Sequence, residues 1–469
     1  MNSIDKVLAE LPAGIVTRDP DIMEAYLVDF RRQMTGRTQA VLRPGNTAEV
    51  QQVVRACAAS GVALVPQGGN TGYCAAATPS GDGSELVISL ERMTALRDLD
   101  PGNLSLTVEA GMILAEVQRA ADEAGLLLPL ALGSQQSCRI GGNLSTNAGG
   151  ISVLRYGMAR DLVLGLEVVL PDGSLFSELS PLRKNNSGYD VKQLFLGAEG
   201  SLGIITAASL KLVRRPRQTV TAFLAISDIA SLAEILGLAQ EQTGEAITSF
   251  EYMSDASLSL LLAARPDLRH PLGKRCAHYV LLEAATASPV LNLDETVTAL
   301  LEQLFQRGLV VDGAIAASGQ QRAAFWHLRE NIPEAEVHHG GSVKHDIAVR
   351  SSQLARFVAK ATGIVTQHAP DAILSIYGHV GDGNVHFNIL APAGADGPAY
   401  KRRQEQVVSP LIYALAADMG GTFSAEYGIG RIKLGLLERH AAPGKIALMR
   451  ALKQALDPQG IMNPGKVVP

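Results

Sequence analysis

The sequence has few aromatic residues, no excess of positive charge and few cysteines, and each shortage excludes a class of protein. Aromatic residues make up 4% of the 469 residues, and the formal charge is −5. We therefore expect no nucleic acid partner, because binding one requires a basic surface and stacking platforms. The four cysteines are scattered, with no C-x-x-C pair, so we expect reduced thiols rather than a disulfide framework.

Targeting and membrane-spanning segments are also missing from the pattern. No apolar run reaches the roughly 18 residues that indicate a membrane-spanning helix. The first residues, MNSIDKVLAELPAGIVTRD, have neither the long apolar core of a secretory signal nor the Arg/Ser-rich pattern of a transit peptide. We expect a cytoplasmic protein, and peripheral contact with a membrane stays open.

The chain is longer than one ordinary domain, and changes in its residue pattern divide it into three segments. Short helices and strands joined by glycine-rich connections fill 1–215, with a core at about 36–215. Strand-like runs alternate with amphipathic helices over 216–424, which is typical of helices packed on a mostly antiparallel sheet. The segment 425–469 contains a helix and is expected to return to the first domain. We predict an α+β fold.

Three glycine-rich segments, 66–74, 132–150 and 197–205, contain the sequence's strongest binding signal. Adjacent glycines leave backbone N–H groups unshielded, and such a nest can hold a pyrophosphate, although tight turns alone explain many such loops. The segment 132–150 combines five glycines with small polar residues, which permits close approach of a large ligand. None of the three is a G-x-G-x-x-G that opens a helix, so a nicotinamide Rossmann site is not expected.

A pair of histidines lies in the stretch GHVGDGNVHF, residues 378–387. Asp382-Gly383 is the preferred central pair of a two-residue type I′ turn. Such a turn predicts that His379 and His386 lie directly opposite each other, with Cβ atoms about 5 Å apart. Two imidazoles at that separation suit one divalent ion, and two unrelated surface histidines are the alternative interpretation.

Several motifs, in order and over nearly the whole chain, indicate a family. These are PQGGNTG, IGGNLSTNAGG with RYG, LGLEVVLPDG, GAEGSLGIIT, GHVGDGNVHFNI, SAEYGIG and LDPQGIMNPGK. The chain resembles the vanillyl-alcohol oxidase/p-cresol methylhydroxylase superfamily and, within it, the FAD-linked D-lactate and D-2-hydroxyglutarate dehydrogenase branch. The resemblance implies a two-subdomain FAD-binding domain, an antiparallel-sheet substrate domain, and oxidation of a D-2-hydroxy acid to the 2-oxo acid.

The resemblance also implies which residues bind FAD. They are Pro66, Gly68, Gly69, Asn70, Thr71, Gly72, Gly133, Ser134, Ser137, Gly141, Gly142, Ser145, Gly149, Gly200, Gly203, Ile205 and Asn463. Some relatives attach FAD through a histidine or a cysteine. No histidine precedes His270, and Cys74 and Cys138 are expected to be small buried residues. We therefore predict non-covalent FAD.

In the resembled branch, the positions of His379, His386 and Glu426 bind a divalent metal, zinc in most cases, with manganese as an alternative. The branch commonly has histidine where this chain has Tyr427, and that histidine is the presumed base. A tyrosine, with an ordinary pKa of about 10, is a weak base at neutral pH. Tyr427 acts as a phenolate, or it orients substrate and relays a proton, or the proton leaves to solvent at the metal. We expect the second.

Arg329 and Lys344 are the predicted substrate-binding cations. Such residues are usually solvated on a surface, but in the resembled branch their equivalents bind substrate carboxylates, and Asn388 is expected to add a hydrogen bond. Two cations favour a dicarboxylate such as D-2-hydroxyglutarate or D-malate over D-lactate. Pro333 stands where some hydroxyglutarate enzymes have threonine, which leaves the contact to the distal carboxylate open.

Three other interpretations remain at this point. The same chemistry on D-lactate or another D-2-hydroxy acid is the nearest. A metal-dependent hydrolase would leave the glycine-rich segments unexplained, and a flavin-binding protein without catalysis is suggested only by Tyr427. The resemblance implies an external electron acceptor, namely a quinone, a cytochrome or an electron-transferring flavoprotein, and a homodimer is compatible with the sequence.

Overall fold

The computed structural model describes residues 2–469, which form two compact units. Unit 1 comprises Met1–Gly149, Gly157–Arg215 and Glu426–Pro469. Unit 2 comprises Gly150–Tyr156 and Pro216–Ala425. Within the described residues, no helix has both the length and the apolar character needed to cross a membrane.

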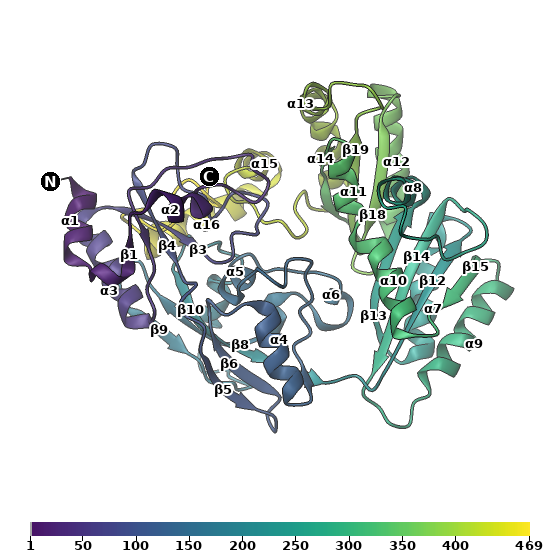
Figure 1. The fold of residues 1–469 in the computed structure, drawn as a ribbon, viewed down its shortest axis with the longest axis horizontal. Helices are drawn as coiled ribbons and strands as arrows, with labels where there is room; N and C mark the ends of the chain where they lie inside the picture. Colours follow the sequence, from purple (N-terminus) through teal and green to yellow (C-terminus); the bar gives the residue numbers. More distant parts are fainter. Residues whose placement is uncertain (1) are drawn as a thin grey trace. The chain divides into compact units, whose positions relative to one another are not determined.

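Unit 1 begins with a small mixed sheet whose strands lie in the order β1-β2-β4-β3 (Figure 1). Its strands are β1 (Val16–Thr17), β2 (Val41–Leu42), β3 (Ala63–Gln67) and β4 (Glu85–Ser89), and its helices are α1 (Ser3–Glu10), α2 (Pro20–Leu27) and α3 (Thr47–Ser60). The helix α3 starts where Asn46 accepts a hydrogen bond from the backbone of Glu49, and it ends at Gly61 with φ +63°. These are the start and stop signals of a helix whose apolar face is buried.

The second part of unit 1 is a five-stranded antiparallel sheet in the order β5-β6-β10-β8-β9. Its strands are β5 (Leu96–Asp100), β6 (Ser105–Glu109), β8 (Val163–Val169), β9 (Leu175–Glu178) and β10 (Ile204–Lys211), with a separate pair β7 (Leu126–Leu127) and β11 (Val213–Arg214). The helices α4 (Leu114–Glu123) and α5 (Ile140–Ser145) lie between β6 and β8 in the sequence. Strands β8 and β9 form a hairpin around Pro171-Asp172-Gly173, in which Val169 pairs with Leu175.

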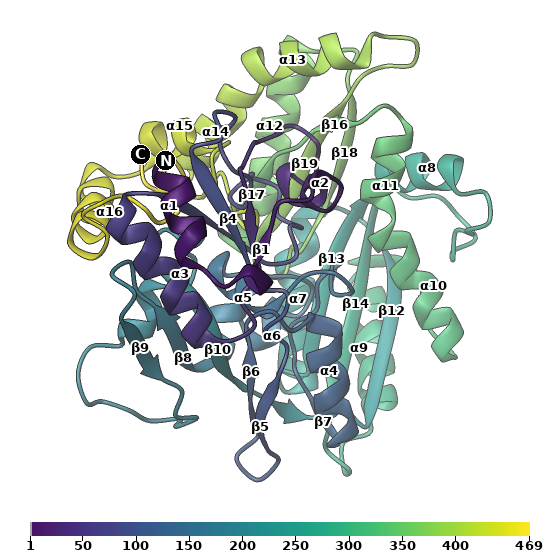
Figure 2. The same cartoon turned by 60° about the vertical axis from the view of Figure 1, so that its left-hand side comes forward.

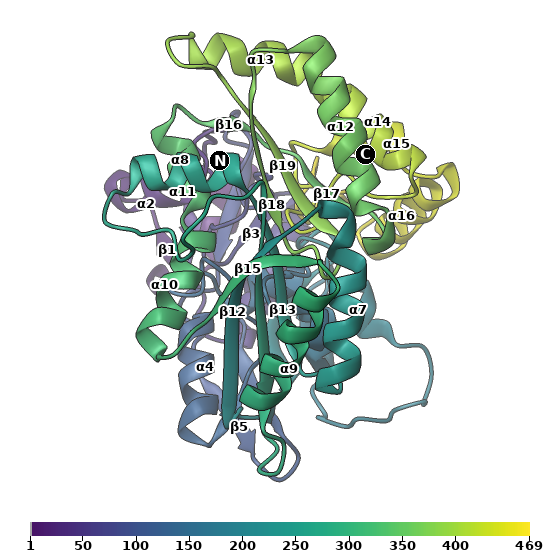
Figure 3. The same cartoon turned by 90° about the vertical axis from the view of Figure 1, so that its right-hand side faces the viewer.

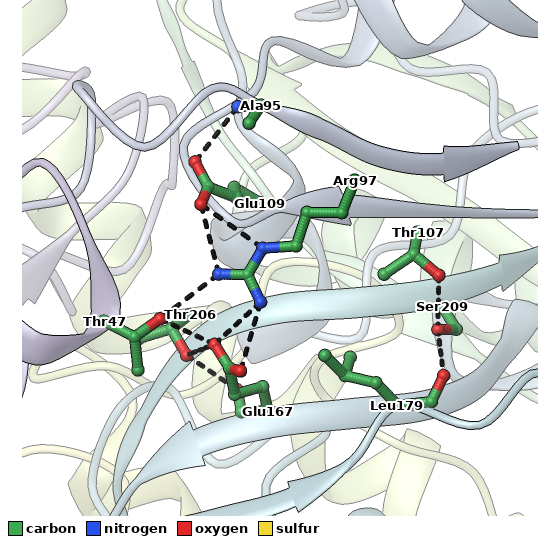
Figure 4. A network of polar contacts seen from close by, with 9 residues as sticks. All are labelled: Thr47, Ala95, Arg97, Thr107, Glu109, Glu167, Leu179, Thr206 and Ser209. Carbon is green, nitrogen blue, oxygen red and sulfur yellow. Dashed lines mark hydrogen bonds and ion pairs between the residues drawn. The ribbon is translucent and has the colours of Figure 1, made fainter.

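A polar network joins the start of the helix α3 to the five-stranded sheet (Figure 4). Arg97 on β5 forms ion pairs with Glu109 and Glu167, each at 3.1 Å. Glu167 also accepts hydrogen bonds from Thr47, at the start of α3, and from Thr206 on β10. Burial alone would raise the pKa of Glu167, but these partners outweigh it and hold the pKa below its usual range. The carboxylate therefore ties the start of α3 to the five-stranded sheet.

The C-terminal segment, with α15 (Leu434–His440) and α16 (Pro443–Leu456), completes unit 1 (Figure 2). Leu64 on β3 donates its N–H to Ile461 and accepts from Asn463, each at 2.8 Å. Lys453 donates to the carbonyl oxygen of Ser201 at 2.8 Å. The last residues of the chain are thus attached to the first strands of the domain through backbone and side-chain hydrogen bonds.

Unit 2 is built on an eight-stranded antiparallel sheet in the order β15-β12-β14-β13-β18-β19-β16, with β17 also paired to β19 (Figure 3). Its strands are β12 (Gln218–Ile226), β13 (Ile247–Ser254), β14 (His278–Thr286), β15 (Val310–Ile315), β16 (Ser342–Val343), β17 (Asp346–Ala348), β18 (Ile373–Gly378) and β19 (Asn384–Leu390). Its helices are α6 (Val153–Tyr156), α7 (Leu232–Thr243), α8 (Asp255–Ala264), α9 (Leu293–Gln306), α10 (Gly319–Glu330), α11 (Ile332–His338), α12 (Leu354–His368), α13 (Gly397–Val407) and α14 (Ser409–Asp418).

The helices cover both faces of this sheet because alternate residues of each strand belong to different cores. Leu224 packs with residues of α7, α9 and α12, whereas Phe223, next to it on β12, packs with residues of α8, α10 and α11. Met253 on β13 and Tyr377 on β18 belong to the second of these cores. The predicted α+β class, with its antiparallel substrate domain, is confirmed.

Candidate active site

A cavity in unit 1 brings the three glycine-rich segments together. Twelve of the predicted FAD-binding residues line it, namely Pro66, Gly68, Gly69, Asn70, Thr71, Gly72, Gly141, Gly142, Ser145, Gly200, Gly203 and Ile205. Residues that lie up to 139 positions apart in the sequence therefore line the same cavity.

The glycines let two of these segments touch through their backbones. A Cβ atom at Gly69 would stand 2.2 Å from the carbonyl oxygen of Ser137, so only glycine fits there. Gly200 has φ +75°, and a Cβ there would lie 2.9 Å from the ring of Pro66. In contrast, Cβ atoms at Gly72 and Gly142 would meet nothing within 4 Å. The lining thus leaves room for a ligand beside unshielded backbone, as a flavin dinucleotide requires.

Five predicted FAD-binding residues lie outside the cavity lining: Gly133, Ser134, Ser137, Gly149 and Asn463. Asn463 is buried and donates its amide N–H groups to the carbonyl oxygens of Ala76 and Glu199, at 3.0 and 2.7 Å. Both acceptors belong to residues of the lining. Asn463 therefore supports the wall of the cavity, and its direct contact with FAD stays a prediction, as it does for the other four.

The sequence argument missed several residues of the lining, among them Asn143, Arg139 and Glu199. Asn143 is buried, and its side-chain nitrogen has no hydrogen-bond partner among the described residues. Such a donor fits a site for a ligand rich in acceptor oxygens. Its neighbours in the motif IGGN were predicted, so a polar residue directly after two lining glycines was the available signal.

Glu199 fastens the C-terminal segment to the cavity. Its carboxylate accepts backbone N–H groups of Ile429 and Gly430 at 2.7 and 2.9 Å. Burial raises the pKa of Glu199 to about 7, although the two N–H donors and Lys433 oppose this shift. A carboxyl between two glycines in GAEGSLG was the sequence signal for this role.

Tyr427 lines the same cavity and is held by aromatic and cationic neighbours of unit 1. The edge of its ring meets Tyr73, with centroids 4.7 Å apart. The guanidinium carbon of Arg31 lies 5.4 Å from the Tyr427 ring centroid and 4.0 Å from that of Tyr73. The ammonium of Lys433 lies 5.3 Å from the Tyr427 centroid. The phenol is therefore a positioned group rather than a mobile surface residue.

In unit 2, the predicted two-residue turn at Asp382-Gly383 is wrong. Strand β18 pairs with β19 so that Tyr377, not His379, lies opposite His386. Residues 379–383 form a wider loop, in which Asn384 donates its N–H to His379 at 3.1 Å. A type I′ turn needs positive φ at both central residues, and here only Gly383 has one.

The physical reason is a tertiary contact of the loop. A Cβ atom at Gly383 would stand 2.0 Å from the carbonyl oxygen of Val349, so this loop packs against the chain that follows β17. The two histidines meet nevertheless, with ring centroids 5.6 Å apart and ring planes at 82°. The predicted proximity of His379 and His386 is therefore correct, although the register behind it is not.

Glu426 joins these histidines. One ligand atom from each of His379, His386 and Glu426 lies within 4.8 Å of the others. The chain itself places Glu426 here, because Ala425 donates its N–H to Asp346, and Asp346 is the residue of β17 paired with His386. Two imidazoles and one carboxylate are a donor set that suits zinc or manganese and leaves open coordination positions. The three residues thus fit a divalent metal ion.

A buried glutamate links His379 to the predicted substrate cation Arg329. Glu251, 1% exposed, lies on β13; it accepts from Nδ1 of His379 at 2.7 Å and from Nε of Arg329 at 2.8 Å. Burial alone would raise the pKa of Glu251, but the charges of His379 and Arg329 outweigh it and lower the pKa. Arg329 is on the helix α10, and it is buried rather than solvated.

A second buried glutamate, Glu336 on α11, holds the other predicted cation. It accepts from Nζ of Lys344 at 2.7 Å, from the hydroxyl of Ser342 at 2.7 Å, and from the amide of Asn388 at 2.9 Å. Lys344 lies between β16 and β17. The break in pairing there lets its side chain reach Glu336 on α11.

Glu251 and Glu336 were not found from the sequence, although a weak signal exists for each. Glu251 is a lone charge in the apolar strand ITSFEYM, and Glu336 is a fully buried acid on a helix that is otherwise partly exposed. Buried carboxylates are costly unless they are paired, so an acid in an apolar run indicates a buried cation elsewhere. The sequence does not say which cation.

Comparison with known proteins gives two matching family models. Residues 38–177 match an FAD binding domain, and residues 215–467 match the C-terminal domain of FAD linked oxidases. The chain is 37% identical to the mitochondrial D-2-hydroxyglutarate dehydrogenase of Danio rerio over 98% of this chain and 84% of that protein. It is 36% identical to the D-2-hydroxyglutarate dehydrogenase of Stutzerimonas stutzeri (strain A1501), over 99% of this chain and 98% of that protein.

Solved structures support the fold. p-Cresol methylhydroxylase with substrate bound aligns with a TM-score of 0.76 at 16% identity, over 99% of this chain and 96% of that one. 4-Ethylphenol oxidase from Gulosibacter chungangensis aligns with a TM-score of 0.73 at 18% identity, with the same shares covered. At these identities the likeness concerns the fold alone.

Proposed function

Because this chain belongs to the FAD-linked oxidases and groups with the D-2-hydroxyglutarate dehydrogenases, we propose that it oxidises D-2-hydroxyglutarate to 2-oxoglutarate with the help of a divalent metal ion. The observation that carries the substrate choice is the arrangement of cations in unit 2. Arg329 is joined through Glu251 to the metal-ligand candidate His379, and Lys344 is held by Glu336. Two fixed cations, one of them joined to a metal-ligand candidate, suit a substrate with two carboxylates.

The cavity of unit 1 would hold FAD without a covalent bond. When bound, FAD would accept the hydride from C2 of the substrate. The loop Gly68–Gly72 would offer backbone N–H groups to the pyrophosphate, and Asn143 would donate its unpartnered amide N–H. Cys74 lines the cavity, but its thiol is directed to the carbonyl oxygen of Gly428 at 3.4 Å, which argues against attachment at sulfur.

His379, His386 and Glu426 would hold the metal ion, zinc or manganese. When bound, the ion would lower the pKa of the substrate's hydroxyl and help to fix its orientation. Arg329 donates its Nε–H to Glu251, so its two Nη groups would bind a substrate carboxylate. Glu426 and Tyr427 are consecutive in the chain, so a candidate metal ligand is covalently joined to a residue that lines the FAD cavity.

Tyr427 would orient the substrate and relay the proton that leaves its hydroxyl. Asn388, whose amide already donates to Glu336, would keep Lys344 and Glu336 in place and complete the substrate contacts. The electron acceptor would be a quinone, a cytochrome or an electron-transferring flavoprotein. We further propose that the protein is cytoplasmic and that it associates with the surface of a membrane when its electron acceptor is located there. A homodimer is compatible with this proposal.

The test of this function is a panel of D- and L-2-hydroxy acids assayed with a dye acceptor, with and without added zinc or manganese. We expect reduction of the bound flavin by D-2-hydroxyglutarate, a lower kcat/KM for D-malate and D-lactate, and no turnover of the L-acids. If kcat/KM is highest for D-lactate, D-lactate replaces D-2-hydroxyglutarate as the proposed substrate, and the proposed reaction type stands. Protein that stays colourless after FAD reconstitution would overturn the proposal.

The substitution Tyr427→Phe is expected to lower kcat at least about 10-fold, since general acid–base groups contribute more than this, while FAD stays bound. The ring contacts with Tyr73 and Arg31 are kept in this variant, so only the hydroxyl is lost. Tyr189→Phe is the matched control, because that ring is 95% exposed in the same unit. Wild-type turnover in Tyr427→Phe would remove this hydroxyl from the mechanism.

A further inference from the structure

The Glu251 carboxylate contacts both a metal-ligand candidate, His379, and a predicted substrate cation, Arg329. It is 1% exposed, and its two carboxylate oxygens are used separately. Oε1 accepts from His379 and Oε2 accepts from Arg329. The three residues come from different elements, namely β13, the loop after β18 and the helix α10.

We propose that Glu251 is a positioning residue that couples the metal site to the recognition of the substrate's carboxylate. This inference rests on the proposed function, since it assumes that His379 ligates a metal ion. Glu251 itself touches neither the ion nor the substrate. It acts by fixing which nitrogen His379 presents and by fixing the direction of the Arg329 guanidinium.

The hydrogen bond to His379 sets the state of the imidazole. A carboxylate can only accept, so Nδ1 of His379 carries the hydrogen, and the lone pair of the neutral ring is at Nε2. A ligating histidine held in this way by a carboxylate is a stronger and better oriented ligand. Removing Glu251 takes away this constraint on the tautomer and rotation of the His379 ring.

The hydrogen bond from Arg329 to Glu251 likewise fixes the direction of the guanidinium. The Arg329 guanidinium is also stacked near Tyr377, with its central carbon 4.9 Å from the ring centroid. Its Nε is held by Glu251 at 2.8 Å in a buried setting, where charge-assisted bonds are strong. An Arg held at Nε and on one face has its Nη pair directed before the substrate arrives, which reduces the ordering cost of binding.

Glu336 provides a matched control within the same unit. Like Glu251, it is a buried glutamate bound to a predicted substrate cation, Lys344. Its hydrogen-bond partners are Ser342, Lys344 and Asn388, none of which is a metal-ligand candidate. A general effect of removing a buried carboxylate therefore appears in both variants, and an effect on the metal appears only at Glu251.

The experiment measures Mn²⁺ binding by titration calorimetry on the FAD-loaded protein after chelation, with no substrate present. We expect Glu251→Gln to weaken Mn²⁺ binding about 10- to 100-fold, the usual effect of losing such a carboxylate. Glu336→Gln is expected to keep the wild-type affinity within about 3-fold. Equal affinity in the wild type and in Glu251→Gln overturns the coupling. Absence of binding in the wild type overturns instead the metal role in the proposed function.

Binding of 2-oxoglutarate, measured in the same way with Mn²⁺ at saturation, distinguishes the two glutamates further. We expect both Glu251→Gln and Glu336→Gln to weaken it, since each loosens one cation. The pattern of Glu251→Gln affecting metal and 2-oxoglutarate, with Glu336→Gln affecting 2-oxoglutarate alone, supports the coupling. Loss of 2-oxoglutarate binding in Glu336→Gln only would overturn the part assigned to Arg329.

A measurement on the unmutated side chain keeps the inference testable if Glu251→Gln does not fold. Nitrogen NMR of the histidine rings, in metal-free protein above pH 8, reports which nitrogen carries hydrogen. The His379 signal is identified by its absence in His379→Gln. We expect the Nδ1–H tautomer to exceed 90% of the population. A majority of the Nε2–H tautomer would overturn the inference.

Discussion

Replacing His386 by asparagine is expected to lower kcat by about 10³-fold or more while leaving FAD bound. The substitution leaves His379 and Glu426 as the remaining ligand candidates, and two donors hold a divalent ion poorly. A metal ion acting on a substrate hydroxyl contributes several kcal/mol, and each 1.36 kcal/mol corresponds to a factor of about ten in rate. The measurements are steady-state turnover with a dye acceptor, metal content, and the visible spectrum of the flavin.

The control is another histidine of unit 2. His338 on α11 is 61% exposed, and its nearest charged partner is Glu334 at 3.8 Å. His338→Asn is expected to keep both metal content and turnover. If His386→Asn retained its metal and its rate, the site at His379, His386 and Glu426 would be unrelated to the reaction. Loss of flavin in this variant would indicate misfolding rather than loss of a ligand.

The pair of histidines shows how far local pattern carries a prediction. The Asp382-Gly383 pair between them correctly indicates a reversal of the chain, and the two rings lie close together. The turn type is not determined locally, because Gly383 packs against Val349, more than thirty residues earlier. The sequence preference for a two-residue turn therefore yields to a tertiary contact, and a five-residue loop results.

The cavity could be anticipated because its signals are local. Each glycine-rich segment is recognisable by itself, and any close approach to a dinucleotide requires such backbone. What could not be anticipated is which residue meets which. Gly69 lies against Ser137, and Asn463 reaches Glu199 from 264 positions away. The segment Gly150–Tyr156, which continues a glycine-rich stretch of unit 1, belongs to unit 2, and nothing in its composition marks this change.

Glu251 and Glu336 were beyond sequence reasoning for a different reason. Arg329 and Lys344 were recognised as cations that act on carboxylates, but the pattern does not show that each already holds one. The partner of Arg329 is 78 positions away, and that of His379 is 128 positions away. The charges of the site can therefore be counted only in the folded chain, where two cations are balanced by two buried glutamates.

Gly69→Ala is expected to weaken FAD binding at least about 100-fold and to give largely colourless protein. The added methyl group would stand 2.2 Å from the carbonyl oxygen of Ser137 and 2.9 Å from Cα of Cys138. Both are backbone atoms that cannot rotate away, so the loop 66–74 must move. Overpacking of this kind costs about 1–3 kcal/mol. The displaced loop would also lose the N–H cradle for the pyrophosphate. Flavin fluorescence titration measures the change.

Gly81→Ala serves as the control, because a Cβ atom there meets nothing within 4 Å and the position is exposed in the same unit. Wild-type FAD affinity in Gly69→Ala would show that the loop is not the pyrophosphate cradle. The substitutions Gly69→Ala and His386→Asn should each abolish the binding of a different cofactor. Gly69→Ala should lose FAD while His379, His386 and Glu426 still bind Mn²⁺, whereas His386→Asn should lose metal and keep FAD. Each variant would then lack one cofactor and keep the other, and neither would oxidise substrate.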